Sequence, residues 1–150
     1  MRILETRGIF YGTDSYEFDE DHLDALSAAE SLGVDSGSVF KTIVMKTDSN
    51  EVCVFCVPAA SEVSLKKARR ATCAKDIAPV RPAELHPLTG YIRGGCSPIG
   101  MKHSFRTFID ETIILHEKVY ISAGMRGLQL VLTPDDLVKA TSATVCSLTG

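Results

Sequence analysis

The chain has 150 residues, of which 45% are hydrophobic and 23% charged, a balance typical of globular proteins and not of disordered or fibrous ones. Its formal net charge of -3 argues against binding nucleic acid through an overall positive field, so any such contact must be local. No apolar run approaches the roughly 20 residues that cross a bilayer, and the first residues lack the apolar stretch of a signal peptide. We therefore expect one cytoplasmic domain over residues 1–150.

Short alternating elements are predicted along the chain, with no internal repeat or linker. In chain order they are a helical turn at 1–6, a strand at 9–18, a helix from the acidic residues 19–21 to Gly33, strands at 39–47 and 51–58, a helix at 64–72, a weak helix at 82–85, strands at 105–109, 112–115, 118–122 and 128–132, a helix capped by Thr133, and a closing strand at 143–148. Strands of mixed direction covered by a few helices indicate an α/β (α+β) fold.

The helix at 64–72 carries a candidate basic patch. Its 100° steps place Leu65, Ala68 and Ala71 on one side and four basic residues, at 66, 67, 69 and 70, on the other. A basic helix face usually means only that it is solvated, so this pattern permits an RNA phosphate contact without requiring one.

The five cysteines form no disulfide framework, because their number is odd and they are scattered. Cys53 and Cys56 have the spacing of a metal motif but lie three apart on a predicted strand, so their side chains should point to opposite faces. The four histidines are isolated. We expect no metal and no cofactor.

Lys41 is the first residue that suggests chemistry. On a strand with a period of two it shares a face with Ile43 and Met45, so an ammonium group occupies a position where the pattern otherwise places apolar side chains. Such a lysine either binds a polar ligand or reaches solvent from the strand end, and the sequence leaves both interpretations open.

The second chemical feature is the sequence Gly-Gly-Cys-Ser-Pro-Ile-Gly at 94–100. Three glycines permit close backbone approach, so amide groups can converge on a carbonyl or phosphate oxygen, although a bulged turn has the same pattern. A turn at 122–127 adds the hydroxyl of Ser122 and the guanidinium of Arg126. Ser97 has no His or Asp at an informative spacing, so no nucleophile and base are predicted.

Four motifs occur in the order seen in YbaK/EbsC proteins, which the chain resembles over nearly its whole length. They are Val-Phe-Lys-Thr at 39–42, Thr-Gly-Tyr at 89–91, the glycine-rich sequence at 94–100 and Arg-Gly-Leu at 126–128. The family is similar to the editing insertion of bacterial prolyl-tRNA synthetases. This resemblance implies a curved, mixed, partly barrel-like sheet flanked by helices, and the removal of a wrong amino acid, most typically cysteine, from the acceptor end of tRNA(Pro).

The resemblance also implies roles for individual residues. Lys41, Gly95 and Ser97 would be catalytic, with Lys41 contacting the 3′-terminal nucleotide or the ester and the loop amides surrounding the aminoacyl carbonyl. The implied substrate-binding residues are Tyr16, Gly94, Cys96, Gly100, Ser122 and Arg126.

In this family the thiol of the cysteinyl substrate is thought to attack its own ester, which agrees with the missing catalytic triad. Four positions depart from the family pattern and affect substrate choice: Phe18, Cys96, Ala123 and Gln129. Two other interpretations stay open. One is a deacylase that uses water on alanyl-tRNA or another small aminoacyl-tRNA, and the other is a non-catalytic module that binds tRNA or prolyl-tRNA synthetase. No DNA or membrane partner is expected.

Overall fold

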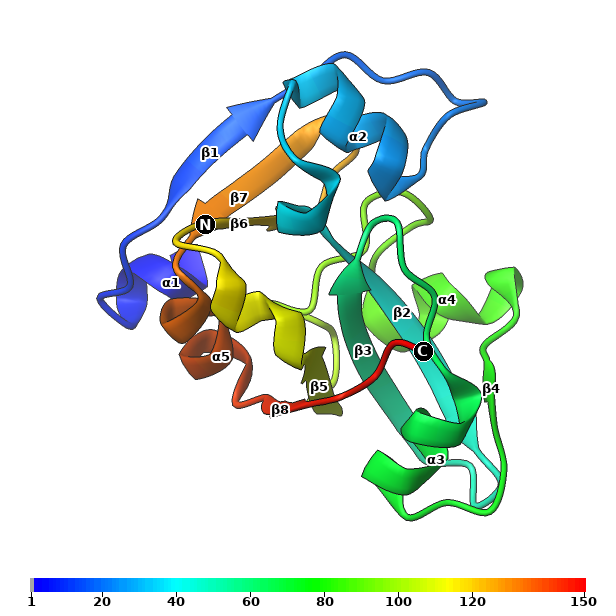
Figure 1. Cartoon of the computed structure of the whole chain (residues 1–150). Coiled ribbons are helices and arrows are strands. Elements are labelled where there is room, and N and C mark those ends of the chain that lie inside the picture. Colours follow the sequence, from blue (N-terminus) through cyan, green and yellow to red (C-terminus); the bar gives the residue numbers. More distant parts are fainter. Residues whose placement is uncertain (1) are drawn as a thin grey trace.

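The computed structural model describes residues 2–150 as short helices and strands in two sheets (Figure 1). In chain order the elements are α1 (Arg2–Thr6), β1 (Gly12–Ser15), α2 (Ala25–Leu32), the 3-10 helix η1 (Ser36–Ser38), β2 (Phe40–Thr47), β3 (Val52–Pro58), α3 (Leu65–Thr72), β4 (Ile77–Pro79), α4 (Pro82–Thr89), β5 (Arg106–Asp110), the 3-10 helix η2 (Glu111–Leu115), β6 (Val119–Ser122), β7 (Leu128–Leu132), α5 (Pro134–Thr141) and β8 (Thr144–Cys146). The predicted mixed α/β fold is confirmed.

The strands are divided between two sheets instead of forming one. The smaller sheet has the antiparallel order β1-β7-β6, and the larger sheet has the mixed order β4-β2-β3-β5-β8. A single parallel bridge between Val39 and Tyr120 connects the start of β2 to β6. The partly barrel-like closure expected from the family is not confirmed by this pairing.

Strand β3 runs through the middle of the larger sheet and is buried on both faces. Cys53, Phe55 and Val57 belong to one apolar core, which α3 covers, and Val54 and Cys56 belong to another, shared with the smaller sheet. The alternation follows from the period of two along a strand. It confirms that the two cysteines point to opposite faces, and it explains why the antiparallel β2–β3 hairpin was predictable.

Side-chain caps mark where α2, α3 and α5 begin. Ser64 caps α3 and Thr133 caps α5, as predicted, each accepting a hydrogen bond from a backbone N–H in the first turn. The helix predicted to begin at residues 19–21 begins later, because Asp24 is its N-cap and accepts from the Ser27 N–H at 2.7 Å. Residues 19–22 form a turn in which Asp19 accepts from the Asp21 N–H.

Three further predictions need correction. The strand expected at 9–18 is limited to four residues, because it pairs only with β7. The segment at 112–115, predicted as a strand from its β-branched residues, is the 3-10 helix η2. Asp110 caps this helix, so a local side-chain bond overrides the strand propensity. The short edge strand β4 was missed because only three residues pair.

Asp110 is a buried carboxylate that connects η2 to the C-terminal segment. Its oxygens accept hydrogen bonds from the Thr112 hydroxyl and N–H and from the N–H groups of Leu148 and Thr149. Burial alone raises the pKa of Asp110, but these hydrogen bonds outweigh it and hold the pKa below its usual value. The ionised form is therefore the one that stabilises the fold.

We predict that Asp110→Asn lowers the free energy of unfolding by about 2–3 kcal/mol at pH 7, because an amide cannot accept at both oxygens. The native pKa is lowered, so the stabilisation exists above the unfolded pKa of about 3.9 and disappears as pH falls through the native pKa. Urea unfolding from pH 7 to pH 3 should show the difference shrinking toward acid. Glu117→Gln, at an exposed position, is the control, and an equal loss in both variants would contradict the assignment.

Candidate functional site

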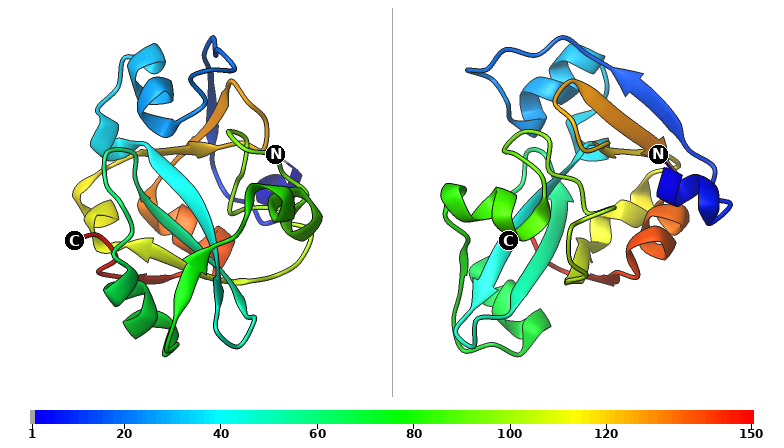
Figure 2. Two further views of the ribbon diagram at one scale, coloured as in Figure 1. Left: turned by 90° about the vertical axis from the view of Figure 1, so that its right-hand side faces the viewer. Right: turned by 180° about the vertical axis from the view of Figure 1, so that it is seen from behind.

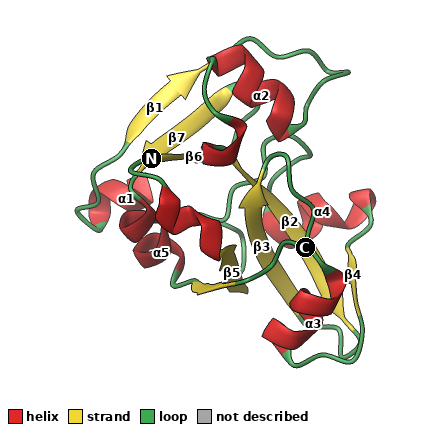
Figure 3. Ribbon diagram, in the orientation of Figure 1, coloured by secondary structure: helices red, strands yellow, loops and turns green. Residues whose placement is uncertain are grey.

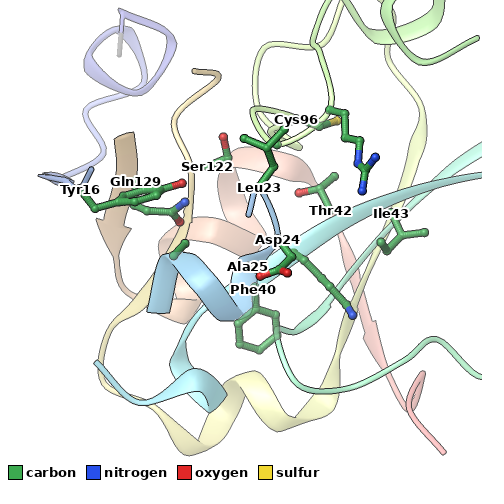
Figure 4. A pocket seen from close by; sticks show the side chains of 14 residues that line it. Tyr16, Leu23, Asp24, Ala25, Phe40, Thr42, Ile43, Cys96, Ser122 and Gln129 are labelled. Carbon is green, nitrogen blue, oxygen red and sulfur yellow. The ribbon is translucent and has the colours of Figure 1, made fainter. Parts of the chain in front are cut away.

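The candidate site is a pocket where α2, the start of β2, the glycine-rich loop and the ends of β6 and β7 meet (Figure 4). Its volume is about 230 Å³, below the roughly 300–1,000 Å³ of drug-sized ligand sites, so it suits a small group. Five residues predicted from the sequence line it: Tyr16, Lys41, Gly94, Cys96 and Ser122. These residues lie up to 106 positions apart in the chain, between Tyr16 and Ser122.

Lys41 lies at the pocket end of β2, and its side chain is 20% exposed. Its Nζ is 3.2 Å from Oε1 of Glu62, whose side chain is 91% exposed. An exposed partner of this kind contributes little binding energy and is easily replaced by a ligand. The ammonium group is therefore available to an anionic or carbonyl oxygen in the pocket.

Asp24 adds a carboxylate to the same wall. Hydrogen bonds from Ser27 are the main cause that lowers the pKa of Asp24, and electrostatic interactions with His22 and Lys41 add to the effect. Because its oxygens are used in capping α2, Asp24 stays ionised and is a poor proton acceptor at neutral pH. Its charge helps to balance that of Lys41.

The opposite wall is polar and comes from the smaller sheet. Ser122 on β6 and Gln129 on β7 are cross-strand partners and both are buried. Tyr16 follows β1, and its N–H donates to the carbonyl of Gly127. Figure 4 shows the Tyr16 and Gln129 side chains on the same wall of the pocket. Gln129 is 5% exposed, and its Oε1 has no hydrogen-bond partner among the described residues.

The glycine-rich loop is pressed against the turn between β6 and β7. A Cβ added at Gly95 would lie 3.2–3.3 Å from the backbone of Met125 and Arg126, and Gly94 has a φ of +85°. The Arg126 Nε donates to the carbonyl of Arg93 at 2.9 Å and holds the two segments together. Gly95 and Arg126 therefore lie behind the pocket and not in its lining.

Two other predicted residues also lie outside the lining. Ser97 is fully buried, and its Oγ accepts a hydrogen bond from the Ile99 N–H. Gly100 lies next to the Tyr91 hydroxyl. The Ser97 hydroxyl thus supports the shape of the loop, and it cannot reach a substrate in the pocket without a rearrangement.

Cys96 lies in the pocket wall but is not an activated nucleophile. Burial raises the pKa of its thiol to about 11, so the thiol is protonated at neutral pH. The pocket lining includes no histidine that could serve as a base. The geometry therefore favours binding and polarising a substrate over attacking it with a protein group.

Several residues of the site were not predicted as such. Asp24, Thr42 and Arg93 line the pocket, as does Gln129, which the sequence marked only as a departure from the family pattern. Strand alternation could have suggested Gln129, because it faces the same side as Ser122 across the β6–β7 hairpin. Of the other departures, Cys96 also lines the pocket, whereas Phe18 is 46% exposed near Gly127 and Ala123 packs against the core shared with the smaller sheet.

No group of three or more His, Cys, Asp or Glu side chains within residues 2–150 could hold a metal ion. Over the same part of the chain, every helix is too short or too polar to span a membrane.

Comparison with known proteins gives matches over most of the chain. Residues 19–140 match the family of the aminoacyl-tRNA editing domain. EbsC of Enterococcus faecalis (strain ATCC 700802 / V583) is 38% identical over 99% of this chain and 91% of its own length. Its name describes it as an inferred Cys-tRNA(Pro)/Cys-tRNA(Cys) deacylase. The crystal structure of an inferred trans-editing enzyme for prolyl tRNA synthetase matches with a TM-score of 0.87 and 26% identity, over 99% of this chain and 93% of that one. A hypothetical protein with a TM-score of 0.90 and 22% identity, matched over 99% of this chain and 97% of its own, shares the fold.

Gln129 gives a direct test of whether the pocket reserves an acceptor for a ligand. A buried acceptor without a partner costs free energy in the unliganded protein. We predict that Gln129→Met, which keeps the length of the side chain and removes the amide, raises the free energy of unfolding by about 1 kcal/mol. Urea unfolding of the ligand-free protein measures the change. Gln129→Glu is the matched control and should be destabilising, because it places a charge there. A loss of stability in the Met variant would show that the amide is already satisfied.

Proposed function

Because the chain belongs to the aminoacyl-tRNA editing family, as the motifs at 39–42 and 94–100 indicated, we propose that it removes cysteine from tRNA(Pro) in trans. Support for cysteine comes from EbsC, whose name gives that substrate, and from the small volume of the pocket. We further propose that residues 1–150 form one editing domain that acts in the cytoplasm. A second, hydrolytic site is needed because synthetases discriminate poorly between amino acids of similar size.

The observation that carries this proposal is a pocket with an available ammonium group and no activated protein nucleophile. Lys41 has only an exposed partner, the Cys96 thiol is protonated, and Ser97 is buried behind the wall. A substrate that supplies its own nucleophile fits such a pocket. A cysteinyl ester has one, since its thiol lies next to the ester carbonyl.

In the proposed reaction the substrate sulfur forms a bond to the ester carbonyl carbon, and the bond from that carbon to the ribose oxygen breaks. The thiol proton ends on the ribose hydroxyl that leaves with the tRNA. Cysteine departs as a four-membered thiolactone, which water then hydrolyses to free cysteine. Binding in one fixed orientation makes the attack effectively intramolecular, which is where much of the rate enhancement arises.

Each wall of the pocket has a part in this reaction. Negative charge develops on the carbonyl oxygen, and the ammonium of Lys41 can stabilise it. The N–H groups of Gly94 and Cys96 have no acceptor within residues 2–150 and are further candidate donors. Gln129 and Ser122 are placed to accept hydrogen bonds from the ammonium group of the aminoacyl moiety or from the terminal ribose.

The alternatives differ in what they predict. Deacylation by water would also remove alanine, and a non-catalytic module would bind tRNA without turnover. A complex with prolyl-tRNA synthetase would supply the tRNA selectivity that a small deacylase lacks, and the structural match to a trans-editing enzyme for that synthetase supports this partner.

We predict rapid loss of cysteine from Cys-tRNA(Pro) and little loss of serine or alanine from the corresponding esters, because neither has a thiol. Serine is the sharper comparison, since it differs from cysteine by one atom. Lys41→Ala should lower kcat/KM for Cys-tRNA(Pro) about 100-fold, the usual effect of removing one oxyanion donor.

The matched control is Lys66→Ala, an exposed lysine on α3, at the other end of the β2–β3 hairpin from α2 (Figure 3). It should leave kcat/KM unchanged. Equal cleavage of the seryl ester would reject the thiol-assisted route, and no turnover of any ester would favour the binding module.

A further inference from the structure

The glycine-rich loop forms a wall of a second cavity. Gly94 and Cys96 line the candidate site, whereas Pro98, Ile99 and Gly100 line this second cavity, whose volume is about 560 Å³. Its other walls are α1, residues 101–107 and the C-terminal end of α5. Figure 2 shows α1 and α5 next to each other, on the side of the molecule away from α3. One loop therefore contributes to both cavities.

The polar side chains that line the second cavity are basic or carry hydroxyls. Arg7, Lys102, His103 and Arg106 line it, and none of its lining residues is Asp or Glu. The chain has more acidic than basic residues, 19 against 16. The lining of this cavity has basic residues and no carboxylate, so its charge is opposite in sign to the net charge of the chain. This arrangement is complementary to an anion.

Two of these cations are already engaged in the fold. The Arg106 guanidinium binds Glu51, at 2.7 Å and 2.8 Å, and the Arg7 Nη1 donates to the carbonyl of Ala140 at 2.8 Å. The side chain of Lys102 makes no ion pair with any described residue. Its backbone N–H donates to the carbonyl of Thr89 at 2.9 Å, so the position of Lys102 is fixed while its ammonium group is free.

We infer that the second cavity binds backbone phosphates of the RNA whose 3′ end enters the candidate site, with Lys102 as the main contact. This inference rests on the proposed function. A chain of net charge -3 repels RNA at long range, so affinity has to come from local cations that replace counterions on phosphates. The arginine, lysine and histidine side chains are exposed at the rim, where a strand passing over the surface reaches them.

Position relative to the loop favours this cavity over α3 as the RNA contact. Among the described residues, Lys67 is the one basic side chain of α3 that is engaged, since its Nζ donates to the Ser147 hydroxyl and the Thr149 carbonyl, so α3 is disfavoured by its position at the far end of the β2–β3 hairpin. The second cavity, by contrast, has a wall in common with the candidate site. RNA bound there would contact the loop that carries Gly94 and Cys96.

The test is the affinity for uncharged tRNA(Pro), measured by fluorescence anisotropy at several salt concentrations. Lys102→Gln should weaken binding about three- to tenfold and reduce the slope of log affinity against log salt by about one, as expected for one lost phosphate contact. Lys102→Arg should restore both values. The matched control Lys66→Gln, on the exposed face of α3, should bind as the wild type does. With Cys-tRNA(Pro), Lys102→Gln should raise KM and leave kcat unchanged.

Wild-type affinity in Lys102→Gln, or an equal loss in Lys66→Gln, would overturn the inference. So would tight binding of ATP or inorganic phosphate that is lost in Lys102→Gln without any change in tRNA affinity, because the cavity would then hold a free phosphate. Uncharged tRNA undergoes no deacylation, so its binding is independent of the proposed activity. Failure of that activity would appear separately, as bound Cys-tRNA(Pro) that keeps its cysteine.

Discussion

The contact between two backbone segments at Gly95 is the constraint on which the candidate site depends. The loop carrying Gly94 and Cys96 approaches the turn after β6 so closely that a Cβ at Gly95 would lie 3.2–3.3 Å from the backbone of Met125 and Arg126. The bond from Arg126 to the Arg93 carbonyl closes the same junction. This contact brings the loop amides to the Ser122–Gln129 wall, while Lys41 arrives from β2 on the other sheet.

Local patterns in the sequence were enough to predict most of the fold. Alternation along β3 predicted that Cys53 and Cys56 face opposite sides, and the hydroxyls of Ser64 and Thr133 predicted two helix starts, because each of these signals lies within a few residues. The helix start at Asp24 and the 3-10 helix after Asp110 were mispredicted. In both places several nearby donor groups could form a hydrogen bond to the carboxylate. The local sequence does not indicate which of these hydrogen bonds form.

The site was predictable only in part. Strand alternation identified Lys41 as an unusual charge, and the spacing of glycines and the turn at 122–127 drew attention to the loop and to Ser122. The family resemblance added Tyr16. Gly94 and Cys96 line the pocket, whereas Gly95 and Ser97 lie behind its wall. This difference depends on how the glycine-rich loop packs against the β6–β7 turn, about 30 residues further along the chain. The unpaired oxygen of Gln129 also depends on packing, since the pocket that it lines is built from residues of both sheets.

In the proposed function the protein positions a substrate that carries its own nucleophile. The most direct measurement is a single-turnover reaction of Cys-tRNA(Pro) with excess protein, quenched in acid and analysed by mass spectrometry for the released cysteine species. With attack by the substrate thiol, cysteine thiolactone is released first and free cysteine follows by hydrolysis. Free cysteine from the earliest time point, with no thiolactone at any time, would contradict it and assign the attack to water.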